Sequence, residues 1–305
     1  MNHILSTRQF NQKQVLEILD RAVKMEDAVK ANKVEQLLKG KIIACLFFEP
    51  STRSRLSFGS AVIRLGGSLL EMEHGSVSSS VYKGETIEDT TRIVNGYSDC
   101  IVMRHPEEYS AERAAKVSDG PIINSGDGGH EHPTQALYDV YTIRKEKGKL
   151  SGLNIAMVGD LMYGRTTHSL LTLLSLFPDN KFYFVAPDRL KMPQEFKDLS
   201  KERGSEFIET DKFEDIFDKA DVVYMTRVQK ERFDSMEEYE NLKHAYVLDN
   251  EIMNRLKKDA IIMHPLPRIG EIDPAIDGDS RAAYFRQARN GVFVRMAILC
   301  HALGL

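Results

Sequence analysis

The fold is decided by the stretch Ile42-Ile43-Ala44-Cys45-Leu46-Phe47-Phe48-Glu49-Pro50-Ser51-Thr52-Arg53-Ser54-Arg55. Its apolar first half, Ile42–Phe47, is typical of a buried strand, and an apolar periodic helix follows through Leu65. Ser51 stands at the N-cap position of that helix, and Gly66-Gly67 follow its end. A strand that leads through a short loop into a helix is the unit from which parallel sheets are built.

The same alternation continues along the chain. Helical spacing dominates Lys13 to Leu38 and Ala282 to Ala302. Short apolar runs recur at Cys100–Met103, Pro121–Asn124, Asn154–Val158, Lys181–Ala186, Asp221–Met225 and Ala260–Met263. Strands separated by helices imply parallel sheets wound by crossovers. We therefore expect an α/β fold of two domains, each a mainly parallel sheet wound by helices, with the C-terminal helix packing back on the first domain.

The length of the chain also favours two domains, because 305 residues exceed the usual size of one domain. The division is expected near a helix over Thr134–Ile143, after which a polar Lys145–Ser151 stretch precedes a new strand. The first domain is then expected to comprise residues 1–133 plus 286–305, and the second residues 134–285.

Composition excludes several classes of protein. The net charge of −4 argues against nucleic acid and against an anionic membrane as partners. The longest apolar run, Leu170 to Phe177, is far shorter than the roughly 18 residues of a membrane span. The N-terminus shows no secretory pattern, so a cytoplasmic location is expected. The widely spaced Cys45, Cys100 and Cys300 are expected to be buried small side chains rather than disulfides or zinc ligands.

The residues that follow the first strand suit an anion. A helix start offers unsatisfied N–H groups and a partial positive charge, and here the hydroxyls and Arg53 of Ser51-Thr52-Arg53-Ser54 add further donors. Together they favour a phosphate dianion. Simple capping with solvent-facing arginines is the alternative.

The loop Gly128-Gly129-His130-Glu131-His132-Pro133-Thr134-Gln135 could suggest a metal site. Three potential ligands within three residues cannot easily converge from one loop, and no cysteine joins them. A histidine held just ahead of a helix is better interpreted as a hydrogen-bond donor to an oxygen of a ligand. We therefore expect neither a metal nor an organic cofactor.

The second half of the chain opens with a loop that differs by one residue from a nucleotide-binding P-loop. In Gly159-Asp160-Leu161-Met162-Tyr163-Gly164-Arg165-Thr166, Arg165 stands where the phosphate-binding lysine belongs. A lysine acts as a compact charge on phosphates, whereas an arginine fork matches a carboxylate bidentately. The spacing also fails the Gly-x-Gly-x-x-Gly pattern, which counts against a nicotinamide enzyme.

Cations recur where strands end. Arg53, Arg104, Arg165 and Arg227 all follow predicted strands, and in parallel sheets ligands bind beyond the carboxyl ends of strands. Four such cations predict a multiply anionic ligand. A later strand is followed by His264-Pro265-Leu266-Pro267-Arg268, for which a rigid turn is the simplest interpretation.

These residues closely resemble the aspartate carbamoyltransferase catalytic-chain family, and the resemblance runs from about Lys41 to Ala302. The motifs stand in the family's order: Phe47-Phe48-Glu49-Pro50-Ser51-Thr52-Arg53, Lys83-Gly84-Glu85-Thr86, His132-Pro133-Thr134-Gln135, Tyr163-Gly164-Arg165-Thr166, Thr226-Arg227-Val228-Gln229 and His264-Pro265-Leu266-Pro267. Ser54 departs from the usual threonine, which keeps the hydroxyl and loses a methyl group.

The resemblance implies a carbamoyl phosphate site in the first domain. Its phosphate ligands are Ser51, Thr52, Arg53, Ser54 and Arg104. The carbonyl oxygen is contacted by His132, Arg104 and the Ser54 hydroxyl. The carbamoyl nitrogen is held by Gln135 and by the backbone carbonyls of Leu266 and Pro267.

The resemblance also implies an aspartate site in the second domain. Arg165 binds the α-carboxylate, and Arg227 with Gln229 binds the β-carboxylate. Ser79 and Lys83 resemble loop residues that a neighbouring subunit donates into the site, where Lys83 serves binding and catalysis. At least a homotrimer follows, and association with a separate regulatory chain stays open.

The implied activity transfers the carbamoyl group of carbamoyl phosphate to the amino group of aspartate, a step of pyrimidine biosynthesis. Ornithine carbamoyltransferase is the nearest alternative. It would show a cysteine in the His264 motif and an Asp with a Ser-Met-Gly segment at the amino-acid site, whereas this chain has Pro265 and Arg227. An inactive paralogue that acts as a scaffold is the other alternative, and the filled motif positions argue against it.

Overall fold

The computed structural model describes residues 2–73, 84–229, 233, 235–242 and 245–305. The chain forms two compact units. Unit 1 comprises Met1–Tyr141 and Arg289–Leu305, and unit 2 comprises Thr142–Ala288. Their boundaries lie within two helices, α6 (Pro133–Lys147) and α11 (Tyr284–Leu303). In the described part of the chain, no helix combines the length and the apolar character that crossing a membrane requires.

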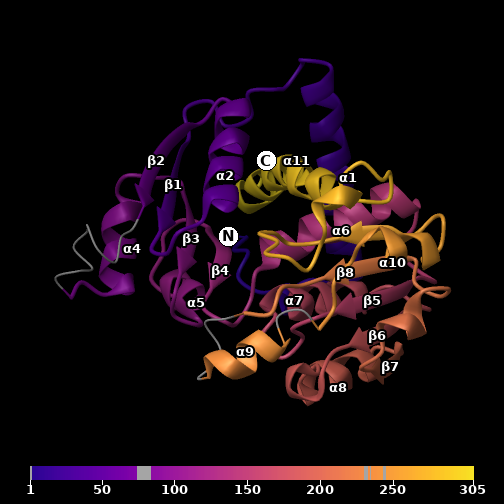
Figure 1. Cartoon of the computed structure of the whole chain (residues 1–305). Helices are drawn as coiled ribbons and strands as arrows, with labels where there is room; N and C mark the ends of the chain where they lie inside the picture. Colours follow the sequence, from indigo (N-terminus) through magenta and orange to yellow (C-terminus); the bar gives the residue numbers. More distant parts are fainter. Residues whose placement is uncertain (1, 74–83, 230–232, 234, 243–244) are drawn as a thin grey trace. The chain divides into compact units, whose positions relative to one another are not determined.

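Unit 1 is built on a parallel sheet of four strands in the order β2-β1-β3-β4. Its strands are β1 (Ile42–Phe47), β2 (Ser68–Glu73), β3 (Cys100–His105) and β4 (Ile122–Asp127). Its helices are α1 (Gln12–Lys30), α2 (Thr52–Arg64), α4 (Ile87–Asn95), α5 (Ser110–Ala115), the first part of α6 and the last part of α11 (Figure 1). β1 and β3 lie in the middle and are almost wholly buried, as their apolar sequences predict.

Unit 2 contains a parallel sheet of five strands in the order β7-β6-β5-β8-β9. Its strands are β5 (Asn154–Val158), β6 (Lys181–Val185), β7 (Glu206–Thr210), β8 (Val222–Met225) and β9 (Ile261–Met263). The helices that connect them are α7 (Arg165–Leu174), α8 (Gln194–Glu202), α9 (Met236–Leu242) and α10 (Asn250–Arg255). The expected fold of two parallel α/β sheets is confirmed.

Two strands, β2 and β7, were not expected from the sequence. Both lie at an edge of their sheet, and both consist of exposed and half-buried side chains only. The other edge of each sheet is covered, since Ile4 bonds β4 on both sides of Ile123 and residues 281–283 bond β9. An edge that stays open to solvent needs no continuous apolar run, so these two strands carried no such signal.

The first helix is shorter than the expected Lys13 to Leu38, because it ends at Lys30. Asn32 takes a left-handed φ of 52°. Its N–H donates to Val29 O and that of Lys33 donates to Ala28 O, at 3.1 and 2.9 Å. This pair of bonds is a Schellman motif, which satisfies the last carbonyl groups and stops the helix.

The C-terminal helix packs back on unit 1, as expected. The guanidinium of Arg295 lies over the ring of Phe58 in α2 at 5.0 Å, and Asn2 donates to the His301 carbonyl at 3.1 Å. Figure 1 shows α11 in yellow beside α2 and α1. All three cysteines are buried, and Cys300 is part of this helix.

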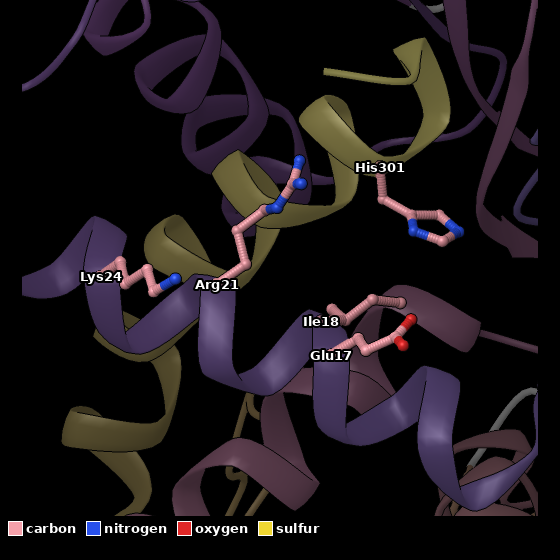
Figure 2. A pocket seen from close by; sticks show the side chains of 5 residues that line it. All are labelled: Glu17, Ile18, Arg21, Lys24 and His301. Carbon is pink, nitrogen blue, oxygen red and sulfur yellow. The ribbon is translucent and has the colours of Figure 1, made fainter.

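A pocket of about 280 Å³ lies where α1 meets the end of α11. Its lining is Glu17, Ile18, Arg21, Lys24 and His301. Figure 2 shows Arg21 directed toward α11 and the His301 ring facing the part of α1 that carries Glu17. Arg21 donates to the backbone oxygen of Leu305. One of the cationic side chains that line the pocket therefore already binds the last residue of the chain. The predicted site residues are not among the lining residues.

Candidate active site

The strand order of each sheet reverses at one position, and ligands of open parallel sheets bind outside the carboxyl ends of the strands at this switch point. In unit 1 the reversal lies between β1 and β3, and in unit 2 it lies between β5 and β8. The loop after β1 leads to Ser51, and β3 ends with Arg104. The loop after β5 leads to Arg165, and Arg227 follows β8. Each unit therefore carries predicted ligands at its own switch point.

The α2 helix begins directly at the switch point of unit 1. Ser51 is its N-cap residue, as expected, with extended backbone at φ −158°. Its side chain makes no capping hydrogen bond within the described structure. Thr52 and Arg53 are exposed, and Ser54 is buried. The helix start thus combines N–H groups of the first turn with hydroxyls and a guanidinium, a donor set that suits phosphate oxygens.

Arg104 is oriented by a carboxylate from the neighbouring strand's loop. Its guanidinium lies 2.7 Å from Glu49 Oε1 and 3.5 Å from the carbonyl of Ser125, measured between N and O atoms. Both side chains are only partly exposed. This ion pair holds the guanidinium near Glu49 and so limits the directions in which Arg104 can donate.

The loop before α6 sends its three possible metal ligands in different directions. Glu131 accepts from the Ser6 hydroxyl and from the Thr7 N–H and hydroxyl at 2.6–2.7 Å, which ties the N-terminal segment to this loop. His130 pairs with the buried Asp127 at 3.1 Å. His132 is buried beside Thr134, 3.4 Å from its hydroxyl. Among the described residues, no group of three or more His, Cys, Asp or Glu side chains is placed to hold a metal ion.

Gln135 lies in the first turn of α6, and its buried amide contacts two residues of the same helix face. Its Nε2 donates to Asp139 Oδ1 at 2.9 Å. Its Oε1 accepts from the Tyr138 hydroxyl. Because both its oxygen and its nitrogen are bound, the amide has a defined orientation. An amide exposed on the surface would rotate freely.

In unit 2 the loops after β5 and β8 are joined by Asp160, a fully buried carboxylate. Asp160 accepts from the N–H of Tyr163 at 2.9 Å, and the Gln229 N–H lies 3.4 Å away. The side chain of Gln229 donates to the carbonyl of Tyr163 at 2.9 Å. Burial raises the pKa of Asp160, while these donors and the nearby Arg227 act in the opposite direction. Asp160 therefore holds the segments that carry Arg165 and Arg227 in one arrangement.

Two glycines of the loop that resembles a P-loop allow backbone segments to approach each other closely. Gly159 has a φ of +114°, and a Cβ there would lie 2.4 Å from the Thr226 carbonyl. A Cβ on Gly164 would lie 2.4 Å from the Asp160 carbonyl. Both positions thus admit only glycine because the β5 loop packs on itself and on the end of β8. Packing accounts for these glycines without any nucleotide.

The turn after β9 is fixed by His264. The Leu266 N–H donates to His264 Nδ1 at 2.7 Å, so Nε2 carries the proton and donates to Glu271 Oε1 at 2.7 Å. Burial disfavours the ionised form of Glu271, but the hydrogen bonds that it accepts from His264 and from the Ile269 N–H outweigh burial and lower the pKa of Glu271. The Leu266–Pro267 bond is cis and Leu266 has a φ of 55°. The expected rigid turn is present, and it presents two consecutive carbonyl groups.

The structure thus groups the predicted residues within each unit. Unit 1 brings together Ser51, Thr52, Arg53, Ser54, Arg104, His132 and Gln135 at the ends of β1, β3 and β4. Unit 2 brings together Arg165, Arg227, Gln229, Leu266 and Pro267 at the ends of β5, β8 and β9. Ser79 and Lys83 lie outside the described residues.

Sequence reasoning missed the residues that orient these ligands. Glu49 and Asp160 stand inside the quoted motifs but received no role. Asp139 lies in a buried stretch of helix, where an acidic residue is rare unless it is paired. A carboxylate beside an arginine motif or within an apolar helix was the available signal.

Comparison with known proteins places the chain. Two family models match it: aspartate/ornithine carbamoyltransferase, carbamoyl-P binding domain, over residues 2–145, and aspartate/ornithine carbamoyltransferase, Asp/Orn binding domain, over residues 151–302. An aspartate carbamoyltransferase catalytic subunit of Clostridium novyi is 51% identical over 292 residues, which are 95% of this chain and 95% of that protein. That of Methanocaldococcus jannaschii is 48% identical over 299 residues, covering 98% and 97%.

Solved structures agree with the sequence comparison. The catalytic subunit of M. jannaschii aspartate transcarbamoylase superimposes with a TM-score of 0.92 at 48% identity, covering 98% of this chain and 97% of that one. Aspartate transcarbamoylase of Trypanosoma cruzi, solved with N-(phosphonacetyl)-L-aspartic acid, gives a TM-score of 0.92 at 43% identity, covering 98% and 94%. The chain therefore belongs to the aspartate/ornithine carbamoyltransferase family.

Proposed function

We infer that this chain transfers the carbamoyl group of carbamoyl phosphate to the amino group of L-aspartate, giving N-carbamoyl-L-aspartate and phosphate. The observation that carries this conclusion is the cationic end of unit 2, where Asp160 fixes the loops of Arg165, Arg227 and Gln229. Arginine forks match carboxylates, whereas the side chain of ornithine is itself a cation. The relatives at about half identity are named aspartate carbamoyltransferases, which agrees with this choice.

In the proposed reaction unit 1 binds carbamoyl phosphate. The start of α2 with Ser51, Thr52, Arg53 and Ser54 receives the phosphate, because its N–H groups, hydroxyls and guanidinium all donate. Arg104 joins them, and its pairing with Glu49 sets the direction of its fork.

The carbonyl group is activated by donors. His132, Arg104 and the Ser54 hydroxyl contact the carbonyl oxygen, which becomes negative as the amine attacks. Donors aimed at such an oxygen contribute on the order of 3 kcal/mol each in related oxyanion sites. Gln135 and the carbonyls of Leu266 and Pro267 accept from the carbamoyl nitrogen, and the hydrogen bond from the Leu266 N–H to His264 keeps that turn in place.

Unit 2 binds aspartate, with Arg165 on the α-carboxylate and Arg227 with Gln229 on the β-carboxylate. The amine forms a C–N bond with the carbamoyl carbon, the C–O bond to phosphate breaks, and the leaving phosphate takes the proton of the amine. No side chain is needed as a nucleophile. Orientation of the two substrates can supply roughly 7–11 kcal/mol of the barrier reduction.

The test of this function is a product assay with competing acceptors. The purified chain should form carbamoyl aspartate from carbamoyl phosphate and aspartate, and should form no citrulline from ornithine. Each step above uses only side chains, backbone groups and the substrates, so the activity should survive exhaustive chelation without ATP or magnesium. Citrulline formation, or activity restored only by added metal, would contradict the proposal.

We further propose that the active form is a cytoplasmic homotrimer in which Ser79 and Lys83 of one subunit act in the site of the next. The motivation is the Lys83-Gly84-Glu85-Thr86 motif, matched to the loop that the family donates across its interface. A closed ring with a head-to-tail interface lets each subunit give to one neighbour and receive from the other.

Hybrid trimers test the shared site. Lys83→Ala and His132→Ala should each be nearly inactive alone. After joint unfolding and refolding, every mixed trimer contains one site with both residues intact, so roughly a quarter of the wild-type activity should return. A mixture as inactive as its parents would reject a site shared between subunits.

A further inference from the structure

Unit 1 contains a buried arginine that the proposed reaction does not use. Arg295 of α11 is 2% exposed and stands in the apolar stretch Phe293–Leu299. Its guanidinium carbon lies 5.0 Å from the ring centroid of Phe58 and 5.0 Å from that of Tyr138. Burial lowers the pKa of Arg295, whereas Tyr138 and Asp139 act to raise it. A cation in such surroundings is costly unless an anion compensates it.

Asp139 supplies the negative charge. It is fully buried on α6, and its attraction for Arg295 opposes the effect of burial on that guanidinium. Asp139 also accepts from Gln135 Nε2 at 2.9 Å. Through this hydrogen bond Asp139 holds a residue that the proposed function places against the carbamoyl group.

The three α6 residues form one face of the helix. Gln135, Tyr138 and Asp139 stand at positions i, i+3 and i+4, which are neighbours on a helix surface. The Tyr138 hydroxyl donates to Gln135 Oε1, and Asp139 accepts from Gln135 Nε2. The amide of Gln135 is thus bound at its oxygen and at its nitrogen by two different groups.

These two contacts distinguish the ends of the amide chemically. A carboxylate only accepts, so a half-turn of the amide would set Gln135 Oε1 against Asp139 and lose the hydrogen bond to it. In the observed orientation the amide oxygen accepts from Tyr138 and has capacity for a second hydrogen bond, as any carbonyl oxygen has. The group offered to a ligand is therefore an acceptor.

We propose that Arg295, Asp139 and Tyr138 are positioning residues that hold the Gln135 amide with its oxygen toward the carbamoyl NH₂, and so select a carbamoyl over an acyl phosphate. The inference rests on the proposed function, in which Gln135 binds the carbamoyl nitrogen. A site built to accept from an N–H discriminates against an analogue that lacks it. Arg295 acts through Tyr138, since its guanidinium lies over the Tyr138 ring at 5.0 Å and packs it in place.

The experiment compares carbamoyl phosphate with acetyl phosphate, in which a methyl group replaces the amino group. Asp139→Asn removes the charge that orients the amide. Its kcat/KM for carbamoyl phosphate should fall about tenfold, the value of one hydrogen bond. The inhibition constant of acetyl phosphate should stay within about twofold, because no N–H is involved. Tyr138→Phe keeps the ring that Arg295 contacts. It should lower kcat/KM for carbamoyl phosphate by less than Asp139→Asn does.

Two further variants separate positioning from folding. The double variant Asp139→Asn with Arg295→Met removes both buried charges, so it should unfold near the wild-type temperature and still show the lost selectivity. Tyr141→Phe is the matched control: Tyr141 is a buried residue of the same helix whose hydroxyl donates instead to Glu26 at 2.6 Å. It should leave the ratio of the two phosphates unchanged.

The outcomes that overturn the inference are distinct from failure of the proposed function. Equal weakening of both phosphates, or unchanged selectivity in Asp139→Asn and in the double variant, would reject the positioning role while the wild-type chain still makes carbamoyl aspartate. A wild-type chain that makes no carbamoyl aspartate would instead reject the function on which the inference rests.

Discussion

At the end of its sheet unit 1 adds hydroxyls and the start of α2 to its arginines, whereas unit 2 has two arginines whose loops a buried carboxylate holds together. At the β1–β3 switch point, Ser51 occupies the N-cap position of α2, but in the described structure its side chain makes no capping hydrogen bond. At the β5–β8 switch point, Asp160 joins the two loops at 2.9 and 3.4 Å. The same sheet geometry therefore carries two kinds of anion site.

The difference follows the shape of the anions. A phosphate is tetrahedral and accepts from many directions, which suits N–H groups and hydroxyls around a helix start. A carboxylate is planar and pairs with a guanidinium fork, so the fork must be oriented in advance. Asp160 provides this orientation in unit 2. The two units should accordingly respond differently when their ligands are removed.

The largest effect is expected for Arg227→Ala. Loss of the fork removes a charge-assisted contact to aspartate and misplaces its amine, so kcat/KM for aspartate should fall roughly 10²–10³-fold. Both a higher KM and a lower kcat are expected. The dissociation constant of carbamoyl phosphate, measured by calorimetry, should barely change because that ligand belongs to unit 1.

Arg255→Ala is the control for this variant. Arg255 is a cation of the same unit whose guanidinium lies 4.5 Å from the ring centroid of Phe217, where it serves packing. Its loss should leave both substrates unaffected. If Arg227→Ala weakened carbamoyl phosphate as much as aspartate, the assignment of one anion to each unit would be wrong.

An intermediate effect is expected from acid, and in unit 2 it centres on His168. This buried side chain bonds the Leu161 carbonyl at 2.7 Å, next to Asp160, and stacks on Phe196 at 4.1 Å. Burial lowers the pKa of His168 to about 4. Between that value and its ordinary pKa the unfolded chain binds more protons, so stability falls as pH falls, by at most about 3 kcal/mol.

Hydrogen exchange of unit 2 peptides measures this dependence between pH 7 and pH 4.5. The variant His168→Gln can still donate to Leu161 but cannot titrate, so protection of the Leu161 segment should depend less on pH. Unit 1 contains opposing groups, because burial lowers the pKa of His105 whereas Asp127, outweighing burial, raises that of His130. An unchanged slope in His168→Gln would show that another group controls the acid response.

The comparison also shows what the sequence could predict. Strands buried on both faces, such as β1 and β5, carry continuous apolar runs and were found, while the open edge strands β2 and β7 were not. The end of α1 was placed too late because a left-handed asparagine, unlike a glycine or proline, is a weak stop signal.

The site followed the same rule. Residues that face a ligand stand directly after strands, so Arg53, Arg165 and Arg227 could be selected from order alone. Residues that orient them, such as Asp160 and Asp139, depend on contacts between separate loops or helix turns. Spacing in one sequence does not reveal which carboxylate meets which donor. Only the three-dimensional arrangement shows these pairings.

The smallest effect separates two helix caps of unit 1. Asn11 caps α1 with a complete capping box, in which its side chain accepts from the Gln14 N–H at 2.9 Å and Gln14 accepts from the Asn11 N–H at 3.0 Å. Asn11→Ala should lower the free energy of unfolding by about 1 kcal/mol. It should leave the affinity for carbamoyl phosphate unchanged, because Asn11 is not among the residues proposed to bind that substrate.

Ser51→Ala should behave in the opposite way. In the described structure its hydroxyl makes no capping bond, so its removal should change the free energy of unfolding by less than about 0.5 kcal/mol. The affinity for carbamoyl phosphate should fall about tenfold, because a hydroxyl that does not cap the helix is left to donate to the phosphate. Urea unfolding and calorimetry on both variants give the four values. If Ser51→Ala destabilised the chain as Asn11→Ala does and bound carbamoyl phosphate normally, Ser51 would be an ordinary cap, and the contrast between the two units would rest on the arginines alone.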